Sequence, residues 1–437
     1  MTSILERYSK RLAERHPWRW RGEVVKSLGN TIESAGPVIS VGECCEIEDA
    51  SGGIHMAEVI GFRGANVVLM PIEKADGVRF GDAVFASGSG PHVKVGDGLV
   101  GRIVDAGGIP LDGAMMQGAT LRCALEIAPH NPLERMPIQI PLATGVRAIY
   151  CLLTVGRGQR VGIFGGSGVG KSTLIGMMAR NTEADVTVIA LVGERGREVP
   201  EFVQNGIGAD GLARSILVVS TSDQSPLLRM RAALTATTIA EHFAGQGKNV
   251  LLVMDSLTRF AMAAREVGLA AGEPPTAKGY TPSVFDRLAK LVERAGQFRV
   301  GSITAFYTVL MEGDDQRDPL VDSVRSLVDG HLVLSRSLAS EGWYPPIELL
   351  DSISRLMPAI TEKNHRESAA RFRKLMATYA RSEDLVRIGA YKPGSDAELD
   401  RALAARQPMK EFVMQDSTER TRYHESVRAL TALAAEI

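Results

Sequence analysis

Apolar and polar positions change their period along the chain, and the changes divide it into regions of different predicted structure. Past Gly96, apolar runs rich in β-branched residues alternate with segments of helical periodicity, a pattern typical of a parallel sheet covered by helices. Because the runs carry few polar residues, we expect strands that are buried on both faces. The predicted strands are Arg160–Phe164, Asp185–Val192, Ile216–Ser220, Asn249–Met254, Ser302–Tyr307 and Gly330–Leu334.

A different pattern precedes this region. Between Gly22 and about Pro91, short alternating apolar segments are separated by glycine-rich turns, which predicts a small β-barrel. The sequence Gly88–Pro91 then indicates a linker at the end of the barrel.

The two ends of the chain are predicted to be helical. The apolar positions at helical spacing near the start are Ile4, Leu5, Tyr8 and Leu12, and the basic residues between them are Arg7, Lys10, Arg11 and Arg15. They predict a short basic amphipathic helix that ends at Pro17. This helix either packs on the protein or a partner subunit, which is favoured, or contacts a membrane. After about Thr361 the strand pattern ends and the helical period continues, so a helical tail is expected.

Composition and charge indicate a globular protein of several domains. The 437 residues suggest two or three domains, and 45% hydrophobic residues are typical of a globular protein. Lysine plus arginine (50) nearly equals aspartate plus glutamate (51), which argues mildly against a nucleic-acid partner. The four cysteines show no CxxC spacing and are expected to be reduced thiols in a cytoplasmic protein. No apolar stretch predicts a membrane-spanning helix or a signal peptide.

A glycine-rich loop lies between the predicted strand Arg160–Phe164 and a helical run. Its residues are Gly165, Gly166, Ser167, Gly168, Val169, Gly170, Lys171, Ser172 and Thr173. A strand, this loop and a helix together are the context of a phosphate-binding loop. Backbone N–H groups and the helix N-terminus would bind phosphates, Lys171 would reach the β- and γ-phosphates, and Ser172 would give a hydroxyl to Mg²⁺.

Two carboxylates follow other predicted strands. Asp255 ends the run NVLLVMD, at the edge of the sheet where α/β proteins bind ligands. We expect it to bind Mg²⁺, with a helix-capping role as the alternative. Glu194 follows DVTVIALVG and could polarise the water that attacks the γ-phosphate. An ion pair of Glu194 with Arg195 or Arg197 is an equally good interpretation from the sequence alone.

Five motifs then appear in order along the chain. They are GGSGVGKST, VGERGREV, LLVMDSLTRFAMAAREVGLAAGEPPTAKGYTPSVF, GSITAFYTVLMEGDD and DSISRLMP. Together they resemble the catalytic-subunit family of rotary ATP synthases, and most closely its type III export branch of the flagellar kind. The resemblance runs from about Gly22 to the C-terminal helices.

The resemblance implies the domain organisation. It implies a β-barrel domain in 21–92, a RecA-like nucleotide-binding domain in 93–360 and a helical domain in 361–437. The N-terminal amphipathic helix in residues 1–20 lies before the region of resemblance and is predicted from the periodicity alone. The fold class is therefore α/β, with a RecA-like P-loop core between a small barrel and a helical domain.

The resemblance also implies roles for the matching residues. Lys171 and Ser172 would bind nucleotide and Mg²⁺. Asp255 would be the magnesium aspartate, and Glu194 of the GER motif the catalytic carboxylate. The implied cofactors are ATP and Mg²⁺.

Arginines and aromatic residues complete the implied site. Arg195 and Arg259 would lie in the phosphate-binding shell, and Arg195 would assist catalysis. Arg355 resembles the arginine that a neighbouring subunit projects into the site. Tyr344 matches the aromatic that stacks on adenine. Phe412 is a candidate second aromatic, although core packing explains it equally well.

An assembly is implied as well. The family resemblance suggests a homohexamer on the inner face of the cytoplasmic membrane at the flagellar base, with peripheral membrane contact left open. The implied partners are a negative regulator, a coiled-coil stalk protein, the membrane export gate, and export chaperones with their flagellar substrates. The loop Ala271–Pro282 is expected to face the central pore.

Three alternatives stay open. One is a virulence-type secretion ATPase, which shares the catalytic motifs. Another is a proton-coupled synthase subunit, which would use the same residues. The third is an RNA-translocating hexameric ATPase, whose barrel would need exposed stacking aromatics. We expect Phe62, Phe80 and Phe85 in the barrel core, so no nucleic-acid partner is predicted.

Overall fold

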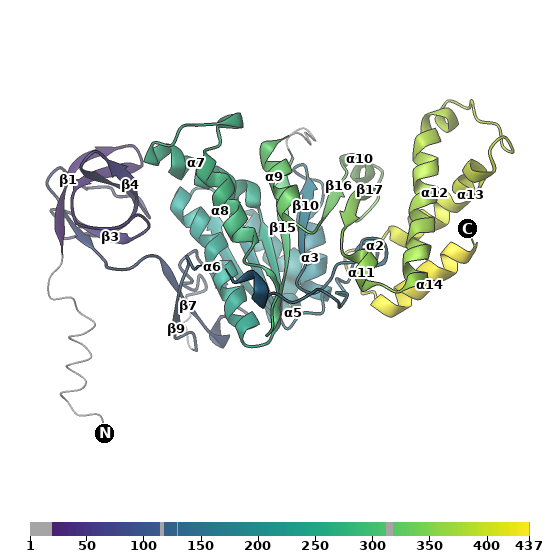
Figure 1. Cartoon of the computed structure of the whole chain (residues 1–437), viewed down its shortest axis with the longest axis horizontal. Helices are drawn as coiled ribbons and strands as arrows, with labels where there is room; N and C mark the ends of the chain where they lie inside the picture. The colour runs from purple at the N-terminus through teal and green to yellow at the C-terminus, as the bar shows by residue number, and fades with distance from the viewer. Residues whose placement is uncertain (1–19, 114–117, 129, 312–317, 437) are drawn as a thin grey trace, which may run out of the picture.

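The computed structural model describes residues 20–113, 118–128, 130–311 and 318–436. The chain forms three bodies in a row, with a barrel at one end, a sheet covered by helices in the middle and a group of helices at the other end (Figure 1). The amphipathic helix predicted for residues 1–20 lies outside the described residues except for its last position. Within the described ranges, no helix is both long and apolar enough to cross a membrane.

The first body is a closed antiparallel barrel in the order β1-β2-β5-β4-β3-β6. Its strands are β1 (Arg21–Leu28), β2 (Thr31–Ala35), β3 (Cys44–Glu48), β4 (Ile54–Arg63), β5 (Asn66–Pro71) and β6 (Ala83–Ala86). Alternate residues such as Val24, Ile47 and Val59 point inward and form one apolar cluster, as the period of two requires. The predicted barrel is confirmed.

The prediction that the barrel aromatics lie in its core is wrong. The exposed fraction is 53% for Phe62 and 79% for Phe80, and Phe85 is only partly buried. Phe62 lies at the end of β4, where the last two residues of the strand are exposed, and Phe80 lies in the connection before β6. Burial of the barrel aromatics therefore does not exclude RNA binding.

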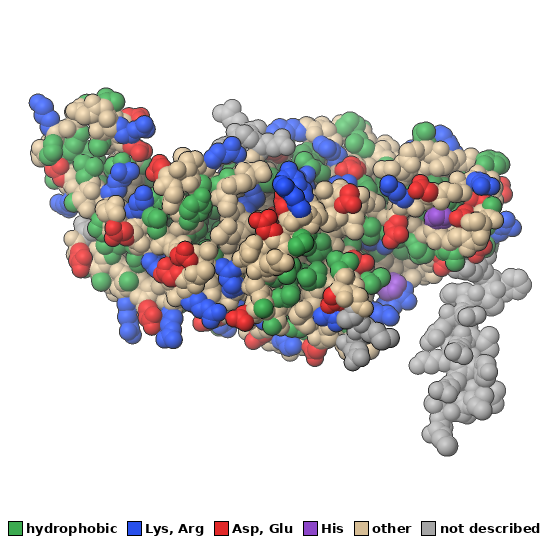
Figure 2. Space-filling view, turned by 180° about the vertical axis from the view of Figure 1, so that it is seen from behind, with side chains coloured by type: hydrophobic (Ala, Val, Ile, Leu, Met, Phe, Trp, Pro, Cys, Tyr) green, Lys and Arg blue, Asp and Glu red, His purple; other side chains and the backbone are tan. Residues whose placement is uncertain are grey.

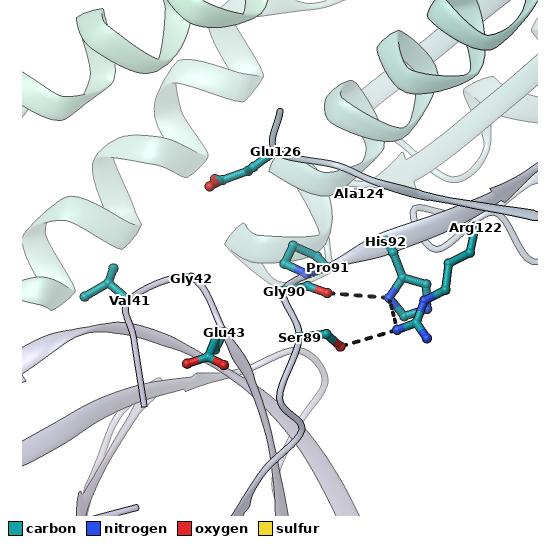
Figure 3. A pocket seen from close by; sticks show the side chains of 10 residues that line it. All are labelled: Val41, Gly42, Glu43, Ser89, Gly90, Pro91, His92, Arg122, Ala124 and Glu126. Atoms are coloured by element: carbon teal, nitrogen blue, oxygen red, sulfur yellow. Dashed lines mark hydrogen bonds between the residues drawn. The ribbon is translucent and has the colours of Figure 1, made fainter. Parts of the chain in front are cut away.

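A two-stranded ribbon joins the barrel to the central body. Strand β7 (His92–Val95) pairs antiparallel with β9 (Leu121–Ala124). A cleft of about 490 Å³ lies between this ribbon, the linker and the barrel. Figure 3 shows the Arg122 guanidinium turned toward the start of β7 and the linker, where it reaches His92 Nδ1 at 2.8 Å and Ser89 Oγ at 3.3 Å.

The central sheet has the order β17-β16-β10-β15-β13-β11-β12-β8. Its strands are β8 (Ile103–Val104), β10 (Arg160–Gly165), β11 (Val186–Glu194), β12 (Ser215–Thr221), β13 (Asn249–Asp255), β15 (Ser302–Leu310), β16 (Gly330–Leu334) and β17 (Ile347–Ser354), and β14 (Gly296–Gln297) pairs with β15. All six predicted strands are present, and their apolar residues are buried on both faces.

The sheet is mixed rather than wholly parallel. The six predicted strands are parallel to one another, as expected, whereas β14 and β17, which the sequence did not indicate, run antiparallel to their neighbours. Strand β17 lies at the edge, and accessible positions are interspersed with the buried ones along IELLDSIS. A half-solvated edge strand lacks the continuous apolar run that marks a central one.

Two apolar clusters cover the two faces of the sheet. On one face α6 (Pro226–Gly245), α7 (Leu257–Ala271), α8 (Pro282–Val292) and α9 (Pro319–Leu327) pack on inward residues such as Val188 and Ala190. On the other, α2 (Arg147–Leu152) and α3 (Lys171–Asn181) pack on Ile189 and Leu191. The alternating side chains of β11 thus serve both clusters.

The last body consists of three helices. They are α12 (Lys363–Arg387), α13 (Ala397–Val413) and α14 (Tyr423–Glu436), and they pack against α2 in the second cluster. His365 Nε2 lies 2.7 Å from the Cys151 carbonyl oxygen. The shorter helices α4 (Glu198–Glu201), α5 (Gly208–Leu212), α10 (Arg336–Ser340) and α11 (Met357–Ile360) belong to connections. Viewed from behind, the described surface intersperses acidic and basic side chains (Figure 2), consistent with the net charge of -1.

Candidate nucleotide-binding site

The glycine-rich loop lies between the end of β10 and the start of α3. Gly168 and Gly170 adopt φ of 76° and 98°, a region that favours glycine. Val169 is buried in the cluster beneath α3, whereas Ser167, Ser172 and Thr173 are exposed. The loop therefore presents the N-terminus of α3 and its hydroxyls to solvent, as phosphate binding requires.

Lys171 is the buried cation of this loop. Its exposed fraction is 8%, and its Nζ donates hydrogen bonds to the carbonyls of Gly165, at 3.1 Å, and Gly166. Burial lowers the pKa of Lys171, and the negative charges of Asp255 and Glu194 oppose this shift. The ammonium is thus held at the loop by weak carbonyl acceptors, which a phosphate can replace.

Asp255 lies at the carboxyl end of β13, with an exposed fraction of 7%. Its Oδ1 accepts a hydrogen bond of 2.6 Å from Thr308 Oγ1 on β15. Burial raises the pKa of Asp255, while Thr308, Lys171 and Arg259 act against this. An aspartate oxygen and the Ser172 hydroxyl are hard donors that fit Mg²⁺.

Glu194 is the last residue of β11, the strand beside β13. Burial raises the pKa of Glu194 to about 8, and the charges of Asp255 and Glu198 add to the shift. Arg259 on α7 is the cation that opposes it. A carboxylate held near neutral pKa at this edge can accept a proton from water.

Arg259 lies beside the end of β11. A Cβ built on Gly193, whose φ is 69°, would come within 3.1 Å of Arg259 Cβ. Its Nε is buried and has no hydrogen-bond partner among the described residues. A partly buried guanidinium whose buried Nε donor has no partner among the described residues is suited to bind an anion.

Replacing Glu194 by glutamine is expected to stabilise the nucleotide-free protein at alkaline pH. Because the folded pKa is raised, the stability contributed by protonated Glu194 is complete below about pH 4.5 and is lost as pH rises through about 8. The gain in unfolding free energy should be near zero at pH 5 and about 2 kcal/mol at pH 8.5. Thermal melts of Glu194→Gln, wild type and the exposed-site control Glu201→Gln at both pH values would measure it, and equal gains at both would contradict it.

Arg195 is turned away from these residues. Its side chain is 64% exposed and pairs with Glu198 at 3.0 Å. Arg195 therefore pairs with Glu198 and not with Glu194, which was the alternative that the sequence left open. The structure does not bring Arg195 to the loop, and its catalytic role stays a prediction.

The two candidate aromatics differ in position. A Cβ built on Gly170 would lie 3.8 Å from Tyr344 Cε1, so Tyr344 borders the loop with an exposed fraction of 47%. Phe412 is 9% exposed and packs on Phe372, with ring centroids 5.9 Å apart. It lies in the core of the helical body, which favours the packing interpretation.

Arg355 lies far from the loop of its own chain. Ser354 pairs with Gly330, the first residue of β16, whereas the loop follows the carboxyl end of β10. Arg355 is exposed and donates to the Val328 carbonyl oxygen at 3.1 Å. Because β17 runs antiparallel, Arg355 is at the opposite edge of the sheet from Lys171.

Sequence reasoning missed Thr308 and Glu198. Thr308 lies within an apolar strand, where threonine is expected for its β-propensity. Glu198 follows Glu194 at helical spacing within the quoted motif. The only available signal was the polar character of Thr308 in a strand buried on both faces.

The fold and the site define a P-loop ATPase with a RecA-like core. The nucleotide-binding domain model of the ATP synthase alpha/beta family matches residues 145–354. A model described as the T3SS EscN ATPase C-terminal domain matches residues 361–432. The chain therefore belongs to the ATP synthase alpha/beta family, in its group of flagellum-specific ATP synthases and type 3 secretion system ATPases.

Relatives of both kinds align along nearly the whole chain. The flagellum-specific ATP synthase of Bacillus subtilis is 52% identical over 94% of each chain. That of Treponema pallidum is 52% identical over 98% of this chain and 96% of its own. The type 3 secretion system ATPase of Xanthomonas euvesicatoria is 45% identical over 99% and 98%.

A solved structure shares the fold. The assembled ATPase EscN of the enteropathogenic Escherichia coli type III secretion system has a TM-score of 0.89 and is 44% identical, over 94% of this chain and 100% of that one. EscN in complex with its central stalk EscO has a TM-score of 0.87. The barrel, central sheet and helical body of this chain therefore recur together in a type III secretion ATPase.

Proposed function

We propose that the protein couples ATP hydrolysis to the export of flagellar proteins through the flagellar type III secretion apparatus. The observation that carries the proposal is the near-full-length identity of 52% with flagellum-specific ATP synthases. The proposed assembly is a homohexamer at the cytoplasmic face of the membrane, supported by the assembled state of EscN. Its partners would be a stalk protein, as EscN has EscO, with a negative regulator, the export gate and chaperone-bound substrates.

The site residues suit hydrolysis of a bound nucleotide. Lys171 and the N–H groups of the loop would hold the phosphates. Ser172 and Asp255 would hold magnesium, which neutralises charge on the β- and γ-phosphates when it is bound. Glu194 would accept a hydrogen bond from the attacking water and orient it.

The transition state would also need positive charge around the phosphates. Arg259 is placed beside Glu194 and would contact the γ-phosphate. Arg355 of a neighbouring subunit would supply the second guanidinium. One chain then contributes to two sites, because the arginine and the loop occupy opposite edges of its sheet.

Flagellar export in a strain that carries Glu194→Gln tests the proposal. The variant should bind ATP but not hydrolyse it, and secretion of flagellar proteins and motility should fall sharply. Normal export with hydrolysis abolished would reject the motor role. Retained motility with loss of other secreted proteins would favour the virulence-type function, which the similarity to the Xanthomonas ATPase and EscN also supports.

Tyr344→Ala is expected to raise the KM for ATP roughly tenfold with little change in kcat, because base stacking is lost while the phosphate contacts remain. Tyr344→Phe should keep the wild-type KM, since stacking needs the ring and not the hydroxyl. Steady-state kinetics with Phe412→Leu as a comparison would separate the two aromatics. A larger rise in KM for Phe412→Leu than for Tyr344→Ala would reverse their assignment.

A further inference from the structure

Thr308 lies between the two strands that carry the phosphate loop and the candidate magnesium aspartate. Strand β15 pairs in parallel with β10 on one side, where Ile163 is opposite Thr308, and with β13 on the other, where Met254 is opposite Tyr307. Thr308 therefore reaches the carboxyl edge beside Asp255. Its side chain is fully buried.

The side chain of Thr308 and the backbone of Leu310 join the end of β15 to the Asp255 segment. Thr308 Oγ1 donates to Asp255 Oδ1 at 2.6 Å, and it has the Met254 carbonyl oxygen as a second, more distant acceptor at 3.4 Å. The backbone N–H of Leu310 donates to Thr258 Oγ1 on α7 at 2.8 Å. The bond to Asp255 sets the direction of the carboxylate, and the bond from Leu310 fixes the strand relative to the helix that follows Asp255.

The hydrogen bond from Thr308 restricts the orientation of the Asp255 carboxylate. A buried carboxylate needs a donor, and a β-branched threonine holds its hydroxyl in few rotamers. With Oδ1 engaged by Thr308, the carboxylate cannot turn freely about its terminal torsion. The hydrogen bond thus orients a metal ligand in the way that outer-sphere partners commonly do.

We propose that Thr308 is a positioning residue that holds the Asp255 carboxylate with Oδ2 directed to the magnesium of the bound nucleotide. The inference rests on the proposed nucleotide hydrolysis, and it adds a residue that determines the affinity for magnesium. Thr308 acts through Asp255 and does not contact the nucleotide itself.

The test compares variants of the full-length protein by magnesium titration of binding to a fluorescent ADP analogue. Thr308→Val keeps the shape and removes the donor, whereas Thr308→Ser keeps the donor. The matched control is Thr304→Val. Thr304 lies on the same strand, is also buried, and accepts a 2.8 Å hydrogen bond from the Gly158 N–H away from the site.

Thr308→Val should raise the magnesium concentration for half-saturation about tenfold, and Thr308→Ser should restore it to near the wild-type value. Affinity measured with EDTA should be unchanged, because the loop and Lys171 are intact. Thr304→Val should match the wild type both in the magnesium concentration for half-saturation and in the affinity measured with EDTA. If Thr308→Val does not fold, Thr308→Ala removes the same donor without adding volume.

A double-mutant cycle with Asp255→Asn completes the test. In that background Thr308→Val should have no further effect on the magnesium dependence, because Thr308 acts through the carboxylate. Equal magnesium dependence of wild type and Thr308→Val overturns this inference alone. Wild-type protein that binds the ADP analogue without any response to magnesium overturns the proposed function as well.

Discussion

Lys171→Ala is expected to lower ATP turnover by about a thousandfold, the loss typical of removing a charged group that acts on the transition state. Among the described residues, the ammonium donates hydrogen bonds to the carbonyls of Gly165 and Gly166. A triphosphate offers it stronger, charged acceptors within the same loop. The loop from Gly165 to Thr173 contains no second lysine that could replace it.

Turnover and nucleotide affinity of Lys171→Ala should be measured together with a thermal melt. Burial disfavours the charged form of Lys171, so its removal should not lower the melting temperature. Lys290→Ala, a substitution of an exposed lysine on α8 that pairs with Asp286, is the control and should keep full activity. Turnover of Lys171→Ala within tenfold of the control would exclude a role for Lys171 at the phosphates.

The sequence predicted most of the central sheet for one physical reason. Strands that are buried on both faces are continuous apolar runs, and β11 and β13 are of this kind. The positions of Glu194 and Asp255 followed, because the residue after such a run lies at the carboxyl edge. The resemblance to a family added Arg355 and Tyr344, whose roles no local pattern indicates.

What the sequence did not predict depends on contacts between distant segments. Thr308 and Asp255 are 53 residues apart, and only the pairing of β13 with β15 brings them together. The exposure of Phe62 follows from its place at the accessible end of β4, which an apolar residue in an apolar run does not reveal. The edge position of Arg355 follows from the antiparallel direction of β17, and a sequence pattern does not reveal strand direction.

The direction of β17 has a consequence for catalysis. Val161 lies opposite Gly330, which in turn lies opposite Ser354. Gly165 is four residues further along β10, so Arg355 is separated from the loop by at least about 13 Å along the sheet. A chain that acts alone therefore lacks an arginine that the proposed site requires.

Arg355→Ala is expected to lower ATP turnover by about a thousandfold while nucleotide affinity changes little, because the guanidinium would act on transition-state charge in a neighbouring site. Arg355→Lys should not restore activity, since a lysine cannot reproduce the planar donor set. Turnover by Arg355→Ala within tenfold of wild type in assembled protein would contradict the assignment.

Mixing two inactive variants gives the sharpest test. Arg355→Ala subunits keep an intact loop, and Lys171→Ala subunits keep an intact arginine. In a ring with head-to-tail contacts, each site combines the loop of one subunit with Arg355 of the next. When the two variants are mixed at random in equal amounts, about a quarter of the sites combine the intact loop of an Arg355→Ala subunit with the intact arginine of a Lys171→Ala subunit. Turnover should therefore recover toward at most about a quarter of wild type when the two are assembled together. Without recovery in assembled mixtures, Arg355 would have to act within its own chain, which the position of β17 argues against.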